Sequence, residues 1–121
     1  MEQRTTGIPG LEISTVHDGR IVVVAVVGRI QREDFDRAVE AFRGALHGRR
    51  AVIVDGSRCE YLSSSGFGAL AYYGRHMAES GGRLVVVRPP ADVLRRLPAG
   101  VIGGLIPACD TLEEAVEYLE R

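Results

Sequence analysis

The chain contains no lysine, and all 15 of its basic residues are arginine. This absence removes two kinds of chemistry, because neither a Schiff-base lysine nor the lysine of a phosphate-binding loop can exist here. Aldolase-like, pyridoxal-phosphate-dependent and Walker-type ATPase functions are therefore excluded. The formal net charge of −1 also provides no electrostatic footprint for nucleic acid, so we expect no direct binding to it.

Potential metal ligands are scarce as well. The two cysteines, Cys59 and Cys109, and the three histidines show no C-x-x-C or H-x-x-x-H spacing. We therefore expect no metal site and no cofactor, and we expect both cysteines to pack as small apolar side chains.

Signals for export or membrane insertion are missing too. The first ten residues lack the basic-then-apolar pattern of a signal peptide. The longest apolar run, residues 21–27, is far shorter than the ~20 residues needed to span a bilayer. These features predict a reduced, cytoplasmic protein that does not insert into a membrane.

What the chain does contain is the composition of one small globular domain. Its 121 residues, of which 45% are hydrophobic and 26% charged, predict a single domain over residues 1–121 with a core of about 11–119. Residues 11–17 alternate apolar and polar, which predicts an edge strand, and Asp18-Gly19 predicts a hairpin turn. The continuous apolar run 21–27, closed by Gly28, predicts a central strand.

The later elements follow from changes of period. Residues 51–54 predict a buried strand that ends in a turn at Asp55-Gly56, with Cys59 near the following loop. Residues 83–87 predict another short strand, and residues 32–46 and 91–97 predict helices. Thr111 and Glu114 form the pattern of a capping box that opens a C-terminal helix. This order predicts an open mixed sheet covered by helices.

Three consecutive serines, Ser63, Ser64 and Ser65, stand where a predicted strand gives way to a predicted helix. The predicted helix ends at Gly81-Gly82. It has one apolar stripe, which consists of Phe67, Leu70, Ala71, Gly74, Met77 and Ala78. The N–H groups and positive dipole of its first turn would tolerate a phosphate on a serine hydroxyl. The alternative is that serine is simply a preferred N-cap residue.

A second stripe on the same helix suggests a contact surface. Ala69, Tyr72, Tyr73 and His76 recur at i, i+3, i+4 and i+7, offset from the buried stripe. Tyrosine is enriched at the centres of protein interfaces, although one of the two could equally pack against a neighbouring helix. Isolated solvated charges do not indicate a contact surface by themselves. This applies to four arginines that could border the same edge, Arg58, Arg88, Arg95 and Arg96.

The serine segment does not have the pattern of an enzyme. It lacks the Gly-x-Ser-x-Gly elbow of serine hydrolases, and no histidine is placed to act as a general base. Gly66-Phe67-Gly68 lacks the spacing of a nucleotide-binding fingerprint, and Gly66 is better explained as a small residue that allows close approach at the helix start. We therefore expect an interaction module and not an enzyme.

The segment from Cys59 to Val87 is similar to the signature of the STAS domain, the family of anti-sigma factor antagonists and of the cytoplasmic tails of sulfate transporters. The resemblance implies an α/β single domain with a mixed, mostly parallel, four- to five-stranded sheet and about four helices. It also implies a last edge strand at Leu105-Ile106. In this family a Ser-Gly pair precedes the helix, and the serine of that pair is phosphorylated by the cognate anti-sigma kinase. That position is Ser65 here, and Ser64 is its neighbour.

The resemblance implies a partner and a switch. The partner would be an anti-sigma factor, a serine kinase of ATPase fold, bound while Ser65 is unphosphorylated and released once it is phosphorylated. The expected contact residues surround Ser65, and they are Ser63, Ser64, Gly66, Phe67, Ala69, Tyr72, Tyr73, His76 and Gln31.

Two departures from the family pattern keep alternatives open. Ser63 stands where the family usually has an aspartate, and Gln31 ends a turn that usually reads Gly-x-Leu-Asp. These neutral residues favour a STAS subunit or scaffold that is never phosphorylated, in a membrane transport or stress-signalling complex. A small-molecule or lipid binder is a third class, because mixed sheets can host clefts at their strand ends.

Overall fold

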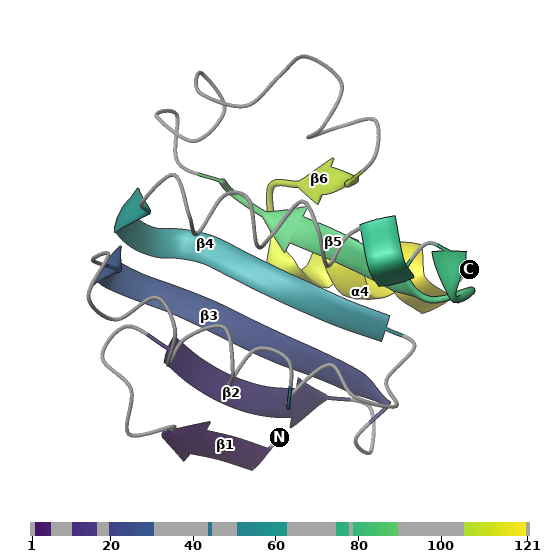
Figure 1. Ribbon diagram of the computed structural model, residues 1–121, viewed down its shortest axis with the longest axis horizontal. Helices are drawn as coiled ribbons and strands as arrows, with labels where there is room; N and C mark the ends of the chain where they lie inside the picture. Colours follow the sequence, from purple (N-terminus) through teal and green to yellow (C-terminus); the bar gives the residue numbers. More distant parts are fainter. Residues whose placement is uncertain are drawn as a thin grey trace.

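The computed structural model describes residues 2–5, 11–16, 20–30, 44, 51–62, 75–77, 79–89 and 106–120. Six strands form one sheet in the order β1-β2-β3-β4-β5-β6 (Figure 1). The strands are β1 (Glu2–Thr5), β2 (Leu11–Val16), β3 (Ile21–Ile30), β4 (Ala51–Leu62), β5 (Arg83–Val87) and β6 (Ala108–Cys109). The one helix with both ends in the described residues is α4 (Leu112–Glu120).

The sheet is mixed, as the sequence predicts. Strands β1, β2 and β3 pair antiparallel, whereas β3, β4, β5 and β6 form a parallel set of four. The α/β class is therefore confirmed, but the strand count is six and not four to five. The missed strand is β1, which pairs outside β2, so the prediction that residues 11–17 form an edge strand is wrong. Its sequence, EQRT, carries no apolar alternation that could reveal it.

The core lies on both faces of the three central strands. Val24, Val52, Ile53 and Val85 are wholly buried, and Leu84 to Val87 of β5 are buried without interruption. This confirms that the continuous apolar runs are strands covered on both sides. The predicted end of the strand at Gly28 is wrong, because β3 continues through Gly28 to Ile30 in its pairing with β4.

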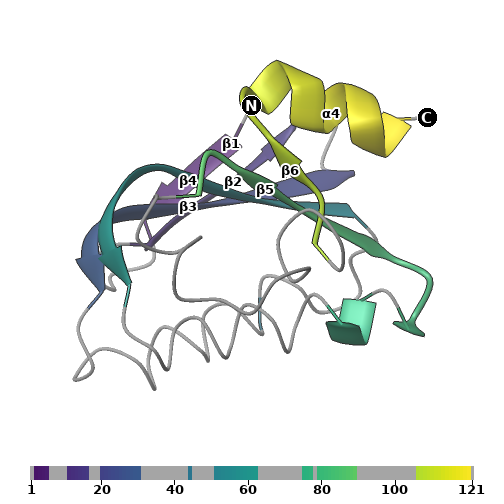
Figure 2. The same ribbon diagram turned by 90° about the horizontal axis from the view of Figure 1, so that it is seen from above.

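Helical segments cover the two faces. On one face Ile21, Val23, Ile53, Val85 and Val87 pack with Ala115 of α4. Figure 2 shows α4 on this face and the helical residues 75–77 on the opposite face.

The end of the predicted serine helix lies in the described residues. Met77 of the apolar stripe is buried, whereas Arg75, His76, Glu79 and Ser80 are exposed, as predicted. The amide of Gly82 donates to the carbonyl oxygen of Met77 at 2.8 Å, and Gly81 has a φ of 84°. This is a Schellman ending, which needs the left-handed conformation that glycine adopts without strain. The predicted end at Gly81-Gly82 is confirmed.

The remaining predicted helices fall mostly outside the described residues. Of the helix predicted over 32–46, only Gly44 is described, and it is helical and exposed. The helix predicted over 91–97 lies entirely outside them, so the expected number of about four helices stays a prediction.

The last strand lies at the edge of the sheet, as predicted, and β6 is Ala108–Cys109. Of the predicted strand Leu105-Ile106, Leu105 lies outside the described residues, and Ile106 forms an isolated β-bridge just before β6. The carbonyl oxygens of Pro107 and Cys109 accept the amides of Val86 and Arg88, each at 2.9 Å. Ile106 is wholly buried, and the ladder between β5 and β6 is formed by the residues after it.

Helix α4 is fixed at both ends. The Glu114 amide donates to Thr111 Oγ1 at 3.1 Å, so the predicted cap opens the helix. Near the other end, Arg83 Nη1 donates to the carbonyl oxygen of Tyr118 at 3.1 Å, and its guanidinium carbon lies 5.5 Å from the Tyr118 ring centroid. Arg83 thereby ties the last turn of α4 to the start of β5.

We predict that Arg83→Met, which keeps the aliphatic stem and removes the guanidinium, lowers the free energy of unfolding by about 1 kcal/mol. Arg75→Met is the matched control, because Arg75 is an exposed helical residue, and a surface change of this kind should stay within about 0.5 kcal/mol of wild type. Urea unfolding measures both changes. Equal stabilities of the two variants would show that the contact with Tyr118 contributes nothing.

Candidate functional site

Strand β4 is longer than its sequence predicts. The predicted turn at Asp55-Gly56 is wrong, because β4 continues through both residues to Leu62. Asp55 Oδ1 accepts the Ser57 amide at 2.9 Å, and Gly56 is buried, so the Asp-Gly pair makes a local irregularity inside the strand. Cys59 consequently lies in a strand and not near a loop. We call residues 56–62 the β4 arm.

Two irregularities in the arm set its register against β3. Between the pairs Ala25↔Asp55 and Val27↔Arg58, one residue of β3 faces two residues of β4. A further extra residue of β4, Glu60, stands between the pairs Gly28↔Cys59 and Arg29↔Tyr61. Each is a β-bulge, which bends the strand and changes the direction of its side chains.

The bulges bring the ends of the two strands into register. The last pair is Ile30↔Leu62, and both strands are parallel, so both run out at the same edge of the sheet. The register of β4 with β5 ends earlier, at Asp55↔Val87, so within the described residues the arm pairs with β3 alone. Partner and ligand sites of open α/β sheets lie outside the carboxyl ends of the strands.

The predicted site continues directly from these two strand ends. Gln31 follows Ile30 in the chain, and Ser63 follows Leu62. Most predicted site residues lie outside the described residues, and these are Ser63, Ser64, Ser65, Gly66, Phe67, Ala69, Tyr72, Tyr73 and Gln31.

His76 is the one predicted contact residue that the structure describes. It is exposed, and its carbonyl oxygen accepts the Ser80 amide at 3.1 Å and Ser80 Oγ at 2.9 Å. These bonds fix the last helical turn. The His76 side chain therefore lies on the surface, as a contact residue must.

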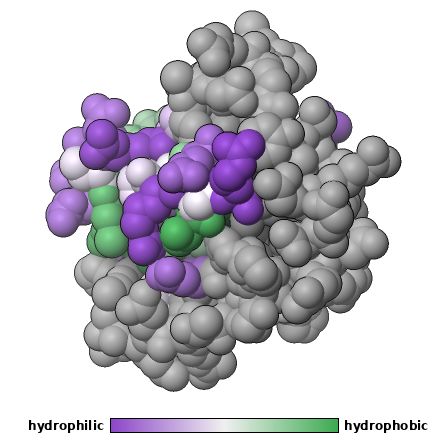
Figure 3. All heavy atoms as spheres, turned by 90° about the vertical axis from the view of Figure 1, so that its left-hand side faces the viewer, coloured by the Kyte–Doolittle hydropathy of each residue, from purple (hydrophilic) through white to green (hydrophobic). Residues whose placement is uncertain are grey.

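The surface around the arm is polar. Figure 3 looks onto the side where β3 and β4 end, and hydrophilic side chains cover most of its described surface, with small apolar patches between them. Ser57, Arg58 and Glu60 of the arm are exposed, as is Arg29 of β3. Such a surface suits a protein contact better than an apolar small-molecule cleft.

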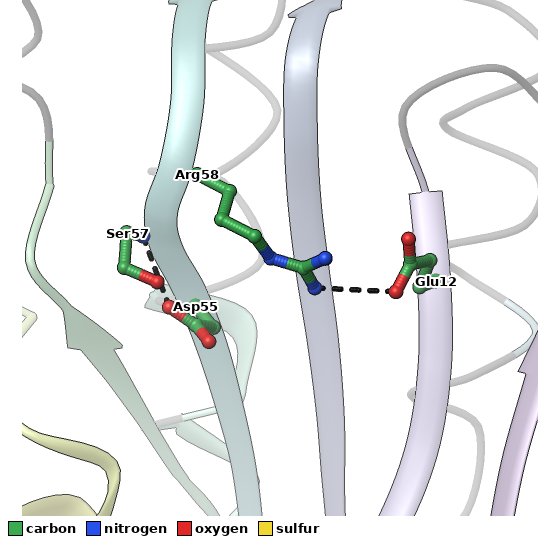
Figure 4. Close-up of polar contacts among 4 residues, drawn as sticks. All are labelled: Glu12, Asp55, Ser57 and Arg58. Carbon is green, nitrogen blue, oxygen red and sulfur yellow. Dashed lines mark hydrogen bonds and ion pairs between the residues drawn. The ribbon is translucent and has the colours of Figure 1, made fainter.

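One ion pair crosses this region. Arg58 Nη2 lies 3.2 Å from Glu12 Oε1, and Figure 4 shows the Arg58 side chain reaching across β3 toward β2. The sequence alone presents Arg58 as an isolated charge and does not reveal Glu12 as its partner. The pairing depends on the strand order and on the first bulge, and neither can be read from the residues themselves.

The described ranges also bear on membrane insertion and metal binding. They contain no helix long and apolar enough to cross a membrane. They also contain no group of three or more histidine, cysteine or acidic residues that could hold a metal ion.

Comparison with known families identifies the fold. Residues 13–107 match the family described as "Mlab, STAS domain". The chain belongs to the STAS-domain family. The resemblance seen in residues 59–87 is therefore confirmed, and the matched range includes both parallel strand ends and the serine segment of this STAS domain.

Solved structures resemble this STAS domain over nearly its whole length. The anti-sigma factor antagonist SpoIIAA in its unphosphorylated form is 20% identical, with 91% of this chain and 97% of that chain covered and a TM-score of 0.69. A putative antagonist from Thermotoga maritima is 18% identical, with 90% and 93% covered and a TM-score of 0.71. An antagonist from Mycobacterium paratuberculosis is 25% identical, with 92% and 93% covered and a TM-score of 0.66. A search of curated protein sequences gives no match.

Gly28 lies next to the second bulge and has a φ of 72°, a left-handed conformation that favours glycine. A Cβ there would meet no atom within 4 Å, so the cost of a side chain is backbone strain alone. We predict that Gly28→Ala lowers the free energy of unfolding by about 1–2 kcal/mol, that Gly28→Val costs more, and that Gly28→Asn costs least. Urea unfolding of the three variants gives the order, and equal stability of all three would contradict it.

Proposed function

We propose that this STAS domain is a cytoplasmic anti-sigma factor antagonist, a single-domain interaction module and not an enzyme. It binds an anti-sigma factor of the ATPase-fold kinase class while Ser65 is unphosphorylated, and it releases that partner when Ser65 carries a phosphate. The observation that carries the proposal is the place of the serines. In the sequence they follow directly on Leu62, the last residue of the arm, and Leu62 pairs with Ile30 at the carboxyl ends of two parallel strands.

Similar structures support this proposal. Among them are SpoIIAA in unphosphorylated and in phosphorylated form, and a serine-to-glutamate variant of RsbS from Moorella thermoacetica, which is 16% identical with a TM-score of 0.72. The same fold thus accommodates a phosphorylated state in a relative. That Ser65 is the phosphorylated residue of this chain is part of the proposal, and variants of Ser65 test it.

The mechanism is local electrostatics. A phosphate on Ser65 adds about −1.5 to −2 charges at the start of the predicted helix, where free N–H groups tolerate an anion in the unbound protein. In an interface of ordinary size, about 1,600 Å², the same charge must lose its water and face any carboxylate of the partner. A loss of about 3 kcal/mol weakens binding more than a hundredfold. No rearrangement of the sheet is required.

A second function is favoured by two residues. Ser63 and Gln31 are neutral where the family usually has acids, and kinase recognition would normally use such charges. The domain would then be a constitutive subunit or scaffold of a transport or stress-signalling complex. Co-purification from native lysate separates the two functions, because the switch predicts an ATPase-fold kinase and the scaffold predicts a membrane transporter component.

Variants of Ser65 test the switch with the co-purified partner. We predict that Ser65→Glu leaves the circular dichroism spectrum unchanged and shifts the melting temperature by only a few degrees, because a carboxylate in a first helical turn suits the dipole. It should weaken partner binding at least tenfold, or by ~1.4 kcal/mol. Ser65→Ala should bind as wild type does and resist release by kinase and ATP. Equal binding of Ser65→Glu and wild type would replace the switch with the scaffold.

A further inference from the structure

Within the described residues, the β4 arm has fewer strand partners than the first part of β4. Strands β4 and β5 pair from Ala51 to Asp55, and within the described residues the arm beyond them pairs with β3 alone. It also contains both bulges, each of which interrupts the ladder with β3. A strand with one partner and an interrupted ladder opens locally more readily than the sheet centre does.

The ion pair between Glu12 and Arg58 supplies a second attachment. Glu12 lies on β2 opposite Ala25, and Arg58 lies on β4 opposite Val27, so the two side chains meet over β3. Arg58 is the first arm residue to regain a partner on β3 after the first bulge. The contact at 3.2 Å thus joins the arm to a third strand at the point where the ladder resumes.

The pair lies on the face of the sheet that α4 covers. Ile21 and Val23 pack with α4, and side chains alternate along a strand, so Ala25 and the opposing Glu12 share that face. The helical residues 75–77 lie on the other face (Figure 2). The pair can therefore hold the arm from behind, without occupying the surface around His76.

We propose that Glu12 and Arg58 are positioning residues, a clamp that holds the β4 arm against β3 and so fixes where the serine segment begins. The role in partner binding rests on the proposed function, whereas the hold on the arm does not. Arg58 does not itself contact the Ser65 hydroxyl or its phosphate in this proposal. It acts through the backbone of residues 59–62, which connects it to Ser63.

The expected size of the effect is modest and local. The Arg58 side chain is 53% exposed and that of Glu12 is 31% exposed, and ion pairs of this exposure change an equilibrium about two- to fivefold. Such a change leaves the fold intact. It should instead raise the fraction of time for which the arm is open.

Hydrogen–deuterium exchange of the backbone amides of residues 59–62 measures the opening directly. We expect Glu12→Gln and Arg58→Gln each to speed this exchange about two- to fivefold, and we expect the double variant to be no faster than either single variant. Exchanging the charges, with Glu12→Arg and Arg58→Glu together, should restore part of the protection. The ion pair of Arg20 with Glu120, at 3.7 Å, gives the matched control, and Arg20→Gln should leave arm exchange unchanged.

Partner affinity supplies the second measurement. If the arm positions the site, Arg58→Gln should weaken binding of the co-purified partner about two- to fivefold, and the charge-exchanged pair should recover it, while Arg20→Gln should bind as wild type does. Arm exchange equal to wild type in both single variants would overturn the clamp. Faster arm exchange in a protein whose wild type binds no anti-sigma factor would support the clamp and remove only the proposed function.

Discussion

Burial of both faces of the parallel strands β3, β4 and β5 is the constraint on which the rest of this structure depends. Val24, Val52 and Val85 have no exposed surface, so neither face of these strands can be left to water. One face is covered by α4, and the other carries the helical residues 75–77 (Figure 2). Burying large β-branched side chains supplies about 1.5–3 kcal/mol each, which dominates the contributions of caps and surface ion pairs.

The polar arm of β4 begins where that constraint no longer applies. Beyond Asp55 the arm of β4 no longer pairs with β5, and its side chains Ser57, Arg58 and Glu60 are exposed. Two bulges turn this part of β4 away from the regular sheet and bring Leu62 opposite Ile30. A rigid buried centre combined with a less supported polar arm suits an interaction module, because a charge added beyond the end of the arm need not disturb the core.

The parts of this architecture that sequence predicts are those with local signals. The apolar runs 21–27 and 83–87, the glycines after residue 80 and the Thr111 cap each depend on a few neighbouring residues, and each is found as expected. The missed features depend on distant pairing. Strand β1 has a polar sequence, and Asp55-Gly56 has the composition of a turn, but hydrogen bonding to β2 and β3 makes both of them strand. The serine segment was visible in the sequence and the role of Ser65 came from the family resemblance, whereas the clamp between Glu12 and Arg58 requires the strand register.

The central claim is that a phosphate on Ser65 changes partner binding through local charge on an unchanged fold. Phosphoserine incorporated at position 65 during translation, followed by two-dimensional NMR of the backbone amides, tests it without any kinase. We predict that the amide chemical shifts change in the serine segment and the β4 arm. The amide signals of Val52 to Val54, Leu84 to Val87 and α4 should keep their chemical shifts. Shift changes spread through those buried strands and α4 would contradict the account, because they would show that the modification rearranges the domain.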